Sequence, residues 1–211
     1  MTHPTLPQTA SAPQPARTHF NTPQLGLEWN YLQPPLEENY LIDPKKETLT
    51  LKGSPLKIGE KGNPSFVGRR LTDIQFTATT RMDFNPTNQQ EEAGLILLNN
   101  GSHFDLMVQS RNGQRVLVVK LQFGQTIYQS SKIELKPGPV DLRIEGTGPE
   151  FIFSYSQNNQ DFTVVETADA RFLSTQTLGW FTGVYTGLYA TGNGYESKAS
   201  AAFSWFDYEG D

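Results

Sequence analysis

The sequence contains no cysteine and only three histidines. Without thiols the chain can form no disulfide, no thiolate metal site and no cysteine nucleophile. His3 and His19 lie in the first twenty residues, and His103 follows an Asn-Asn-Gly turn, where a histidine is typically a solvated turn residue. A Ser-His-Asp triad cannot be assembled from this set. The motifs G-x-S-x-G and the phosphate-binding loop are missing as well.

The sequence also lacks long apolar runs and an excess of basic residues. No stretch approaches the roughly 20 apolar residues of a membrane helix, so we expect no membrane partner. The net charge is −5 and the isoelectric point is about 5.2, which argues against a nucleic-acid partner. Residues 1–17 have no apolar signal-peptide core, which predicts a cytoplasmic rather than secreted protein, unless the chain is a fragment.

Proline is concentrated at the N-terminus. Five prolines fall within residues 1–23, among few large apolar side chains. Such a segment buries too little surface to offset its ordering entropy. We therefore predict a disordered tail or linker remnant over residues 1–23 and a single domain over residues 24–211.

Short apolar alternations with a period of two follow, separated by turn residues. The segment Asp73–Phe84 places Ile74, Phe76, Ala78, Thr80, Met82 and Phe84 on one face, and similar patterns predict strands at the segments 48–52, 93–98, 104–108, 116–123, 127–133, 140–144, 151–155, 162–165, 183–191 and 201–208. In the last of these, Phe203 and Trp205 are expected on one face and Phe206 and Tyr208 on the other. One helical turn is expected near Ala168–Leu173. The chain is therefore predicted to be all-β, a two-sheet antiparallel β-sandwich.

Acidic residues are the first candidates for chemistry, because glycoside hydrolysis needs two carboxyl groups across the scissile bond. Glu91 and Glu92 precede a strand, and Asp141 and Glu145 share a strand face with Arg143. Their spacing in the sequence does not single out any two of these carboxyl groups as a catalytic pair. The ladder from Asp141 to Glu145 is more typical of a solvated outer face with alternating charge.

Aromatic residues are the second candidates, because the apolar C–H faces of a sugar ring stack on aromatic rings. Trp29, Tyr185 and Tyr189 lie near Asn, Gln and Thr side chains and are candidate sugar-stacking residues. Each of them alone is also compatible with core packing.

Four stretches, taken in order, resemble one family. They are Leu-Gly-Leu-Glu-Trp-Asn-Tyr-Leu at 25–32, Pro-Ser-Phe-Val-Gly-Arg-Arg at 64–70, Phe-Thr-Ala-Thr-Thr at 76–80 with Glu-Glu-Ala-Gly-Leu at 91–95, and Leu-Gly-Trp-Phe-Thr-Gly at 178–183 with Phe-Ser-Trp-Phe-Asp-Tyr at 203–208. Together they resemble the C-terminal domain of glycoside hydrolase family 43 β-xylosidases and α-arabinofuranosidases. The resemblance implies a concanavalin A-like jelly roll.

In that family the catalytic acids lie on a separate β-propeller, so the resemblance implies no catalytic residue in this chain. It implies instead that a loop of the sandwich closes the sugar pocket of the propeller. Phe181 matches the aromatic residue of that loop, with Trp180 and Thr182 as its neighbours. Family members carry acids where this chain has Ala202 and Ser204, so we expect no metal, and we expect no cofactor.

Three hypotheses about function follow. The first is an accessory domain that docks on a family 43 β-propeller, in the same chain or a separate one, and completes a pocket for xylo- or arabino-oligosaccharides. The second is a free-standing carbohydrate-binding module for xylan-type glycans. The third is a complete small hydrolase that uses Glu91, Glu92, Asp141 or Glu145. Whether the chain is an enzyme stays open at this point, because no complete catalytic site is evident.

Overall fold

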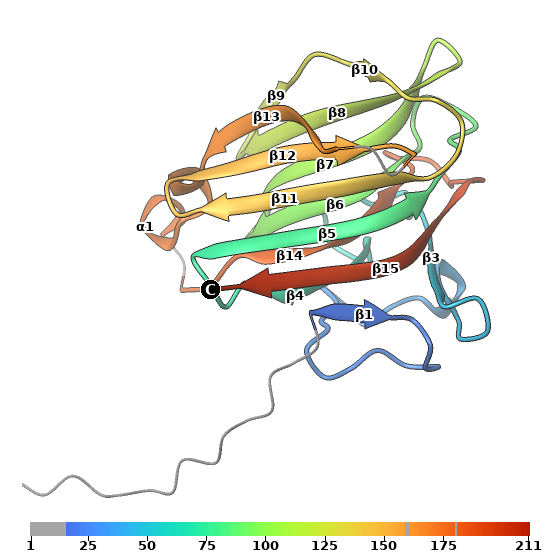
Figure 1. Cartoon of the computed structure of the whole chain (residues 1–211), viewed down its shortest axis with the longest axis horizontal. Helices are drawn as coiled ribbons and strands as arrows, with labels where there is room; N and C mark the ends of the chain where they lie inside the picture. Colours follow the sequence, from blue (N-terminus) through green and yellow to red (C-terminus); the bar gives the residue numbers. More distant parts are fainter. Residues whose placement is uncertain (1–15, 159–160, 180) are drawn as a thin grey trace, which may run out of the picture.

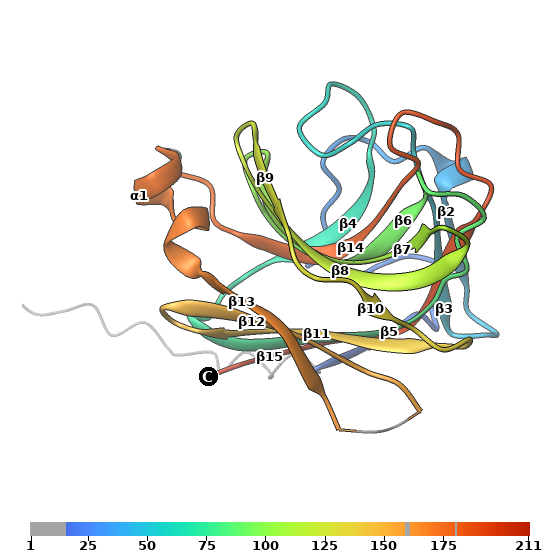
Figure 2. The same cartoon turned by 90° about the horizontal axis from the view of Figure 1, so that it is seen from above.

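The computed structural model describes residues 16–158, 161–179 and 181–211, and over these residues it shows two antiparallel sheets packed face to face. Figure 2 shows the two layers edge-on. The predicted all-β sandwich is confirmed. None of the helices in this part of the chain combines the length and the apolar content that crossing a membrane requires.

The first sheet has eight strands in the order β13-β12-β11-β5-β15-β3-β2, with β1 also pairing with β15. Figure 1 looks onto this sheet. Its strands are β1 (Arg17–His19), β2 (Tyr40–Asp43), β3 (Thr48–Lys52), β5 (Gln75–Asp83), β11 (Val140–Thr147), β12 (Glu150–Ser156), β13 (Thr163–Asp169) and β15 (Ser200–Gly210).

The second sheet has seven strands in the order β10-β8-β7-β6-β14-β4, and β9 also pairs with β8. It curves so that its concave face points away from the first sheet (Figure 2). Its strands are β4 (Ser65–Arg70), β6 (Glu92–Asn99), β7 (Ser102–Arg111), β8 (Gln114–Phe123), β9 (Thr126–Gln129), β10 (Ile133–Glu134) and β14 (Tyr185–Thr191).

Three short helices complete the described chain: the 3-10 helices η1 (Glu37–Asn39) and η2 (Ala170–Leu173), and the single-turn helix α1 (Thr175–Leu178). The helical turn expected near Ala168–Leu173 is confirmed by η2. Strands β1, β2 and β4 were not among the strands predicted from periodicity, because each is short or, in β4, interrupted by Gly68.

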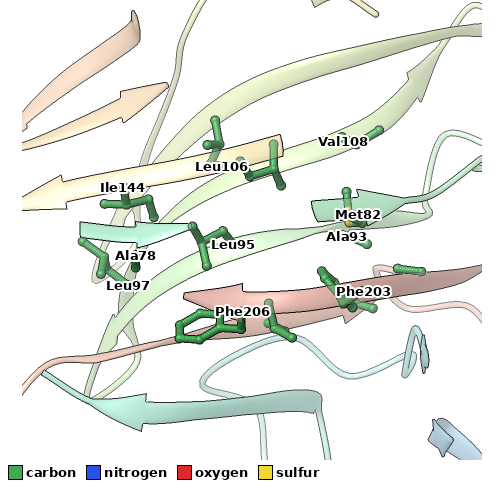
Figure 3. Packing of buried hydrophobic residues seen from close by; sticks show 14 of the residues in the cluster. Ala78, Met82, Ala93, Leu95, Leu97, Leu106, Val108, Ile144, Phe203 and Phe206 are labelled. Atoms are coloured by element: carbon green, nitrogen blue, oxygen red, sulfur yellow. The ribbon is translucent and has the colours of Figure 1, made fainter. Parts of the chain in front are cut away.

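The core lies between the two sheets and follows the alternation read from the sequence. Phe76, Ala78 and Met82 of β5 point inward, as expected, and meet inward side chains of the other sheet such as Leu95 and Leu106. Figure 3 shows this packing. Ile74, expected on the same face, precedes the strand and is 78% exposed.

The last strand departs from simple alternation. Phe203 pairs with Met82 and Trp205 with the adjacent Arg81, so Ser204 forms a β-bulge. The bulge shifts the alternation by one residue, and Phe203, Phe206 and Tyr208 therefore all point into the core. The expected facing of Trp205 with Phe203 is wrong, since Trp205 lies outside under the Arg17 guanidinium.

The domain begins earlier than predicted. Strand β1 pairs with residues 205–207 of β15, and Phe20 is 1% exposed. Both lie within the segment that proline content assigned to a tail. The correction concerns residues 16–23, because residues 1–15 lie outside the described part of the chain.

A loop over residues 53–64, here called the crossing loop, lies over the concave face of the second sheet. Ile58 of this loop is buried against Phe66, Ile96 and Met107. Its backbone N–H donates to Tyr189 Oη at 3.3 Å. Gly59 then packs close to Gly101 at the β6–β7 turn. The crossing loop thereby divides the concave face into two hollows.

Candidate functional site

The predicted pocket loop lies beside one of these hollows. Phe181 is 102% exposed, so its whole ring is in water. Thr182 follows it and is also exposed, and Trp180 lies outside the described residues. The loop-side hollow has a volume of about 410 Å³, and its walls include Leu32, Ile58, Leu98, Thr182, Gly183 and Tyr185.

The base of this loop is held by one buried amide. Asn99, at the end of β6, is 1% exposed. Its Nδ2 donates to the carbonyl of Leu173 at 2.8 Å, and its Oδ1 accepts from Thr182 Oγ1 at 3.0 Å. Asn99 therefore links both ends of the segment 173–182 to the rigid second sheet. This role could not be predicted from the sequence, because Asn99 belongs to an Asn-Asn-Gly stretch that is typical of a turn.

The three aromatic candidates have different surroundings. Trp29 is 6% exposed and lies in the main core, with its ring 5.0 Å from that of Phe206. Tyr189 is 3% exposed and packs under the crossing loop. These placements argue against sugar stacking on either ring, since neither presents an open face. Tyr185 is half-buried, lines the loop-side hollow and lies under the Arg70 guanidinium.

The four candidate catalytic carboxylates are not brought together. Glu91 and Glu92 lie at the start of β6, and Asp141 and Glu145 lie on β11 of the opposite sheet. Asp141 forms a two-point ion pair with Arg81, with N–O distances of 2.7 and 2.9 Å. Arg143 lies 3.5 Å from the centre of the Phe162 ring. The β11 ladder is thus an outer face on which Asp141 pairs with Arg81 and Arg143 packs on Phe162.

Glu91 has a structural role. Its Oε1 accepts from the backbone N–H groups of Lys198 and Ala199 at 2.6 and 2.9 Å, and its Oε2 accepts from that of Thr87 at 2.6 Å. Burial alone would raise the pKa of this carboxyl, but these donors outweigh burial and lower the pKa to about 2.

The second hollow brings together charged groups that lie far apart in the sequence. This polar hollow has a volume of about 260 Å³, and its walls include Lys57, Glu92, His103, Asp105, Lys120 and Gln129. Lys120 Nζ lies 2.5 Å from both oxygens of Glu92, and His103 Nδ1 lies 2.7 Å from Asp105 Oδ1.

His103 is therefore not the solvated turn residue that its neighbours suggested. It is 7% exposed on β7 and shares a face with Asp105. Burial opposes its protonation, but the Asp105 carboxylate outweighs this and holds the pKa of His103 above its ordinary value. The spacing His-x-Asp, which puts both side chains on one face of a strand, was the available signal.

Comparison with known proteins shows which family has this architecture. Residues 17–209 match the family model of the β-xylosidase C-terminal concanavalin A-like domain. The chain is similar to the non-reducing end α-L-arabinofuranosidase BoGH43B of Bacteroides ovatus, at 33% identity over 97% of this chain and 39% of that protein.

Solved structures agree with this match. The Bacteroides ovatus xyloglucan PUL GH43B structure superposes with a TM-score of 0.93 at 33% identity, over 99% of this chain and 42% of that one. A xylan β-1,4-xylosidase from Bacillus halodurans C-125 gives a TM-score of 0.89 at 23% identity, over 99% and 41%, which shows the shared fold.

The chain thus spans about two fifths of the length of these relatives. The homologous full-length enzymes carry the domain in the same chain as a catalytic domain. The concanavalin A-like fold that the resemblance implied is confirmed. The chain belongs to the family of β-xylosidase C-terminal concanavalin A-like domains, the accessory domain of family 43 glycoside hydrolases.

Proposed function

We propose that this chain docks on a family 43 catalytic β-propeller and completes the sugar pocket of that domain with Phe181. The observation that carries the proposal is the full exposure of the Phe181 ring, at 102%, on a loop whose base is fixed. An aromatic side chain on a fixed loop beside an open hollow can insert into another surface as an anchor residue.

The surroundings of the loop support a docking surface. Apolar side chains such as Leu32 and Tyr185 line the loop-side hollow together with polar ones such as Glu60 and Lys61. Leu32 is 39% exposed, so apolar surface is open to a partner there. The Asn99 amide, through its hydrogen bonds to Leu173 and Thr182, restricts the loop before a partner binds. This restriction lowers the conformational entropy lost on docking.

The names of the relatives suggest the substrate class. One is an α-L-arabinofuranosidase that acts at non-reducing ends, and another is a xylan β-1,4-xylosidase. An aromatic wall at the end of a pocket shortens it, so Phe181 would favour cleavage of terminal pentose units over internal bonds. The proposed substrates are arabinose- or xylose-containing oligosaccharides.

A chimaera tests the proposal. This chain replaces the matching region of the Bacteroides ovatus arabinofuranosidase, and hydrolysis of nitrophenyl arabinofuranoside is measured. We expect Phe181→Ala to lower kcat/KM by about 10- to 100-fold, the usual effect of one apolar pocket contact.

Leu27→Ala is the matched control, because Leu27 is an equally exposed apolar residue, at 103%. It should leave kcat/KM unchanged. Equal activity of the two variants would contradict the proposed role of Phe181, and hydrolysis by the isolated chain would contradict the accessory role.

A further inference from the structure

The polar hollow is separated from the Phe181 loop by the crossing loop, and Phe181 and Thr182 are not among its lining residues. Four of its ionisable side chains come from three adjacent strands. With the backbone left out, the exposed fractions of the side chains alone are 8% for Glu92, 9% for His103, 4% for Asp105 and 18% for Lys120. Buried ion pairs contribute little net stability compared with apolar residues of similar size. The charges on this face therefore call for an explanation other than folding.

The mixture of charges suits a neutral ligand. The carboxylates of Glu92 and Asp105 face the ammonium groups of Lys57 and Lys120 and the imidazole of His103, so groups of both signs lie around the hollow. Lys120 and His103 are each already paired with a carboxylate, so a charged ligand would compete with these close contacts. A neutral molecule with many hydroxyl groups can instead bond to oxygens and nitrogens of both signs.

The remaining walls suit such a molecule. Gln122, Gln129 and Asn193 line the hollow, and each amide offers both donors and an acceptor. The Asn193 amide nitrogen already donates to the carbonyl of Gln90 at 2.7 Å, which holds the side chain in place. Ile127, 63% exposed, adds apolar surface for C–H groups. The volume of about 260 Å³ is below the usual range for drug-sized ligands and fits a small one.

We propose that the polar hollow binds one neutral sugar unit of pentose or hexose size, at a site distinct from the pocket that Phe181 is proposed to complete. The hydroxyl groups bond to the Glu92–Lys120 and His103–Asp105 pairs and to the three amides. This site belongs to the chain itself and needs no catalytic partner.

The test is a titration of the isolated, isotope-labelled chain followed by amide NMR shifts. The probes are D-xylose, L-arabinose, D-glucose and xylotriose, with D-glucuronate as a charged counterpart. We expect saturable shifts at β7 and β8 for at least one neutral probe. The affinity should be the same at low and high salt, since a neutral ligand is not screened.

Gln129→Ala is the test variant, because Gln129 lies on the edge strand β9 and its side chain can be removed without opening the core. It should weaken the affinity for the sugar at least threefold. Gln114→Ala, an exposed residue on β8 outside the hollow, is the control and should not change the affinity.

Three outcomes would overturn the site: no saturable shifts with any neutral probe, shifts confined to residues around the loop-side hollow, or binding of glucuronate alone. Unchanged affinity in Gln129→Ala would also count against it. None of these results bears on the chimaera experiment, so the two proposals fail independently.

Discussion

At the scale of single residues, the Glu91 carboxylate connects two loops that are far apart in sequence. It accepts hydrogen bonds from Thr87 on one side and from Lys198 and Ala199 on the other. All of these donors favour the ionised form. Glu91, a candidate catalytic acid in the sequence, therefore has a structural role instead.

The depressed pKa of Glu91 predicts an acid-sensitive contribution to stability. Because its pKa is about 2 in the folded state and near 4.5 in the unfolded chain, the stabilisation is complete above pH 4.5 and is lost as the pH falls toward 2. A difference of this size corresponds to about 3 kcal/mol. Glu91→Gln should lose about 2–3 kcal/mol of unfolding free energy at pH 7 and should show a flatter acid dependence, measured by urea unfolding from pH 7 to pH 3.

Glu134→Gln provides the comparison, since Glu134 is exposed on β10. This variant should unfold like the parent chain at each pH. Equal stability of the Glu91 and Glu134 variants would show that the hydrogen bonds of Glu91 carry no net free energy.

His103 shows the limit of reading a residue from its neighbours. The preceding Asn-Asn-Gly turn is real, with Asn100 and Gly101 both at positive φ. The strand, however, begins at Ser102, one residue before His103, and the crossing loop covers the concave face. The walls around His103 include Lys57 of the crossing loop and Gln122 of β8, and local sequence does not reveal these neighbours.

At the scale of elements, the segment between β13 and β14 is anchored by the buried Leu173 side chain and by the two hydrogen bonds of Asn99. Removing the amide should weaken the hold on both ends of this segment, at a cost of about 1 kcal/mol per hydrogen bond. We expect Asn99→Ala to speed amide hydrogen exchange over residues 173–183 by about tenfold, measured by mass spectrometry on peptides.

Thr182→Val removes one of the two links and keeps the other. It should speed exchange near Thr182 but leave Leu173–Leu178 unchanged. Identical exchange profiles for the two variants would mean that Asn99 does not couple the two ends of the segment.

Strand content was predictable from sequence wherever one face of a strand is apolar, as in β5, β11 and β12. The bulge at Ser204 was not, because it depends on pairing with Arg81 and Met82 of a distant strand. Phe181 was identified only through family resemblance. The polar hollow could not be predicted, since its residues converge from β6, β7, β8, β9, β14 and two loops.

At the scale of the whole molecule, the N-terminal segment contributes to the core although its composition suggested otherwise. Phe20 lies 6.3 Å from Trp29, which in turn packs on Phe206. Trp29 is thus a packing link between the start and the end of the domain.

This link predicts different effects for two truncations. A chain starting at residue 16 keeps β1 and Phe20 and should retain its thermal unfolding midpoint. A chain starting at residue 24, the boundary predicted from proline content, should lose about 3 kcal/mol or more, because a buried phenylalanine is removed. Calorimetry on both chains provides the measurement, and equal midpoints would contradict the role given to this segment.

The pairing of β1 with β15 also places the two ends of the fold on the same edge of the first sheet (Figure 1). Arg17 and Asp207 lie opposite each other and their side chains form an ion pair at 2.6 Å. The first and last strands of the domain are therefore neighbours in space. Joining the ends with a short peptide and opening the chain at the exposed Asn112-Gly113 turn should give a circular permutant with the same core. The same geometry would let the unit be inserted into a surface loop of an unrelated host without stretching it.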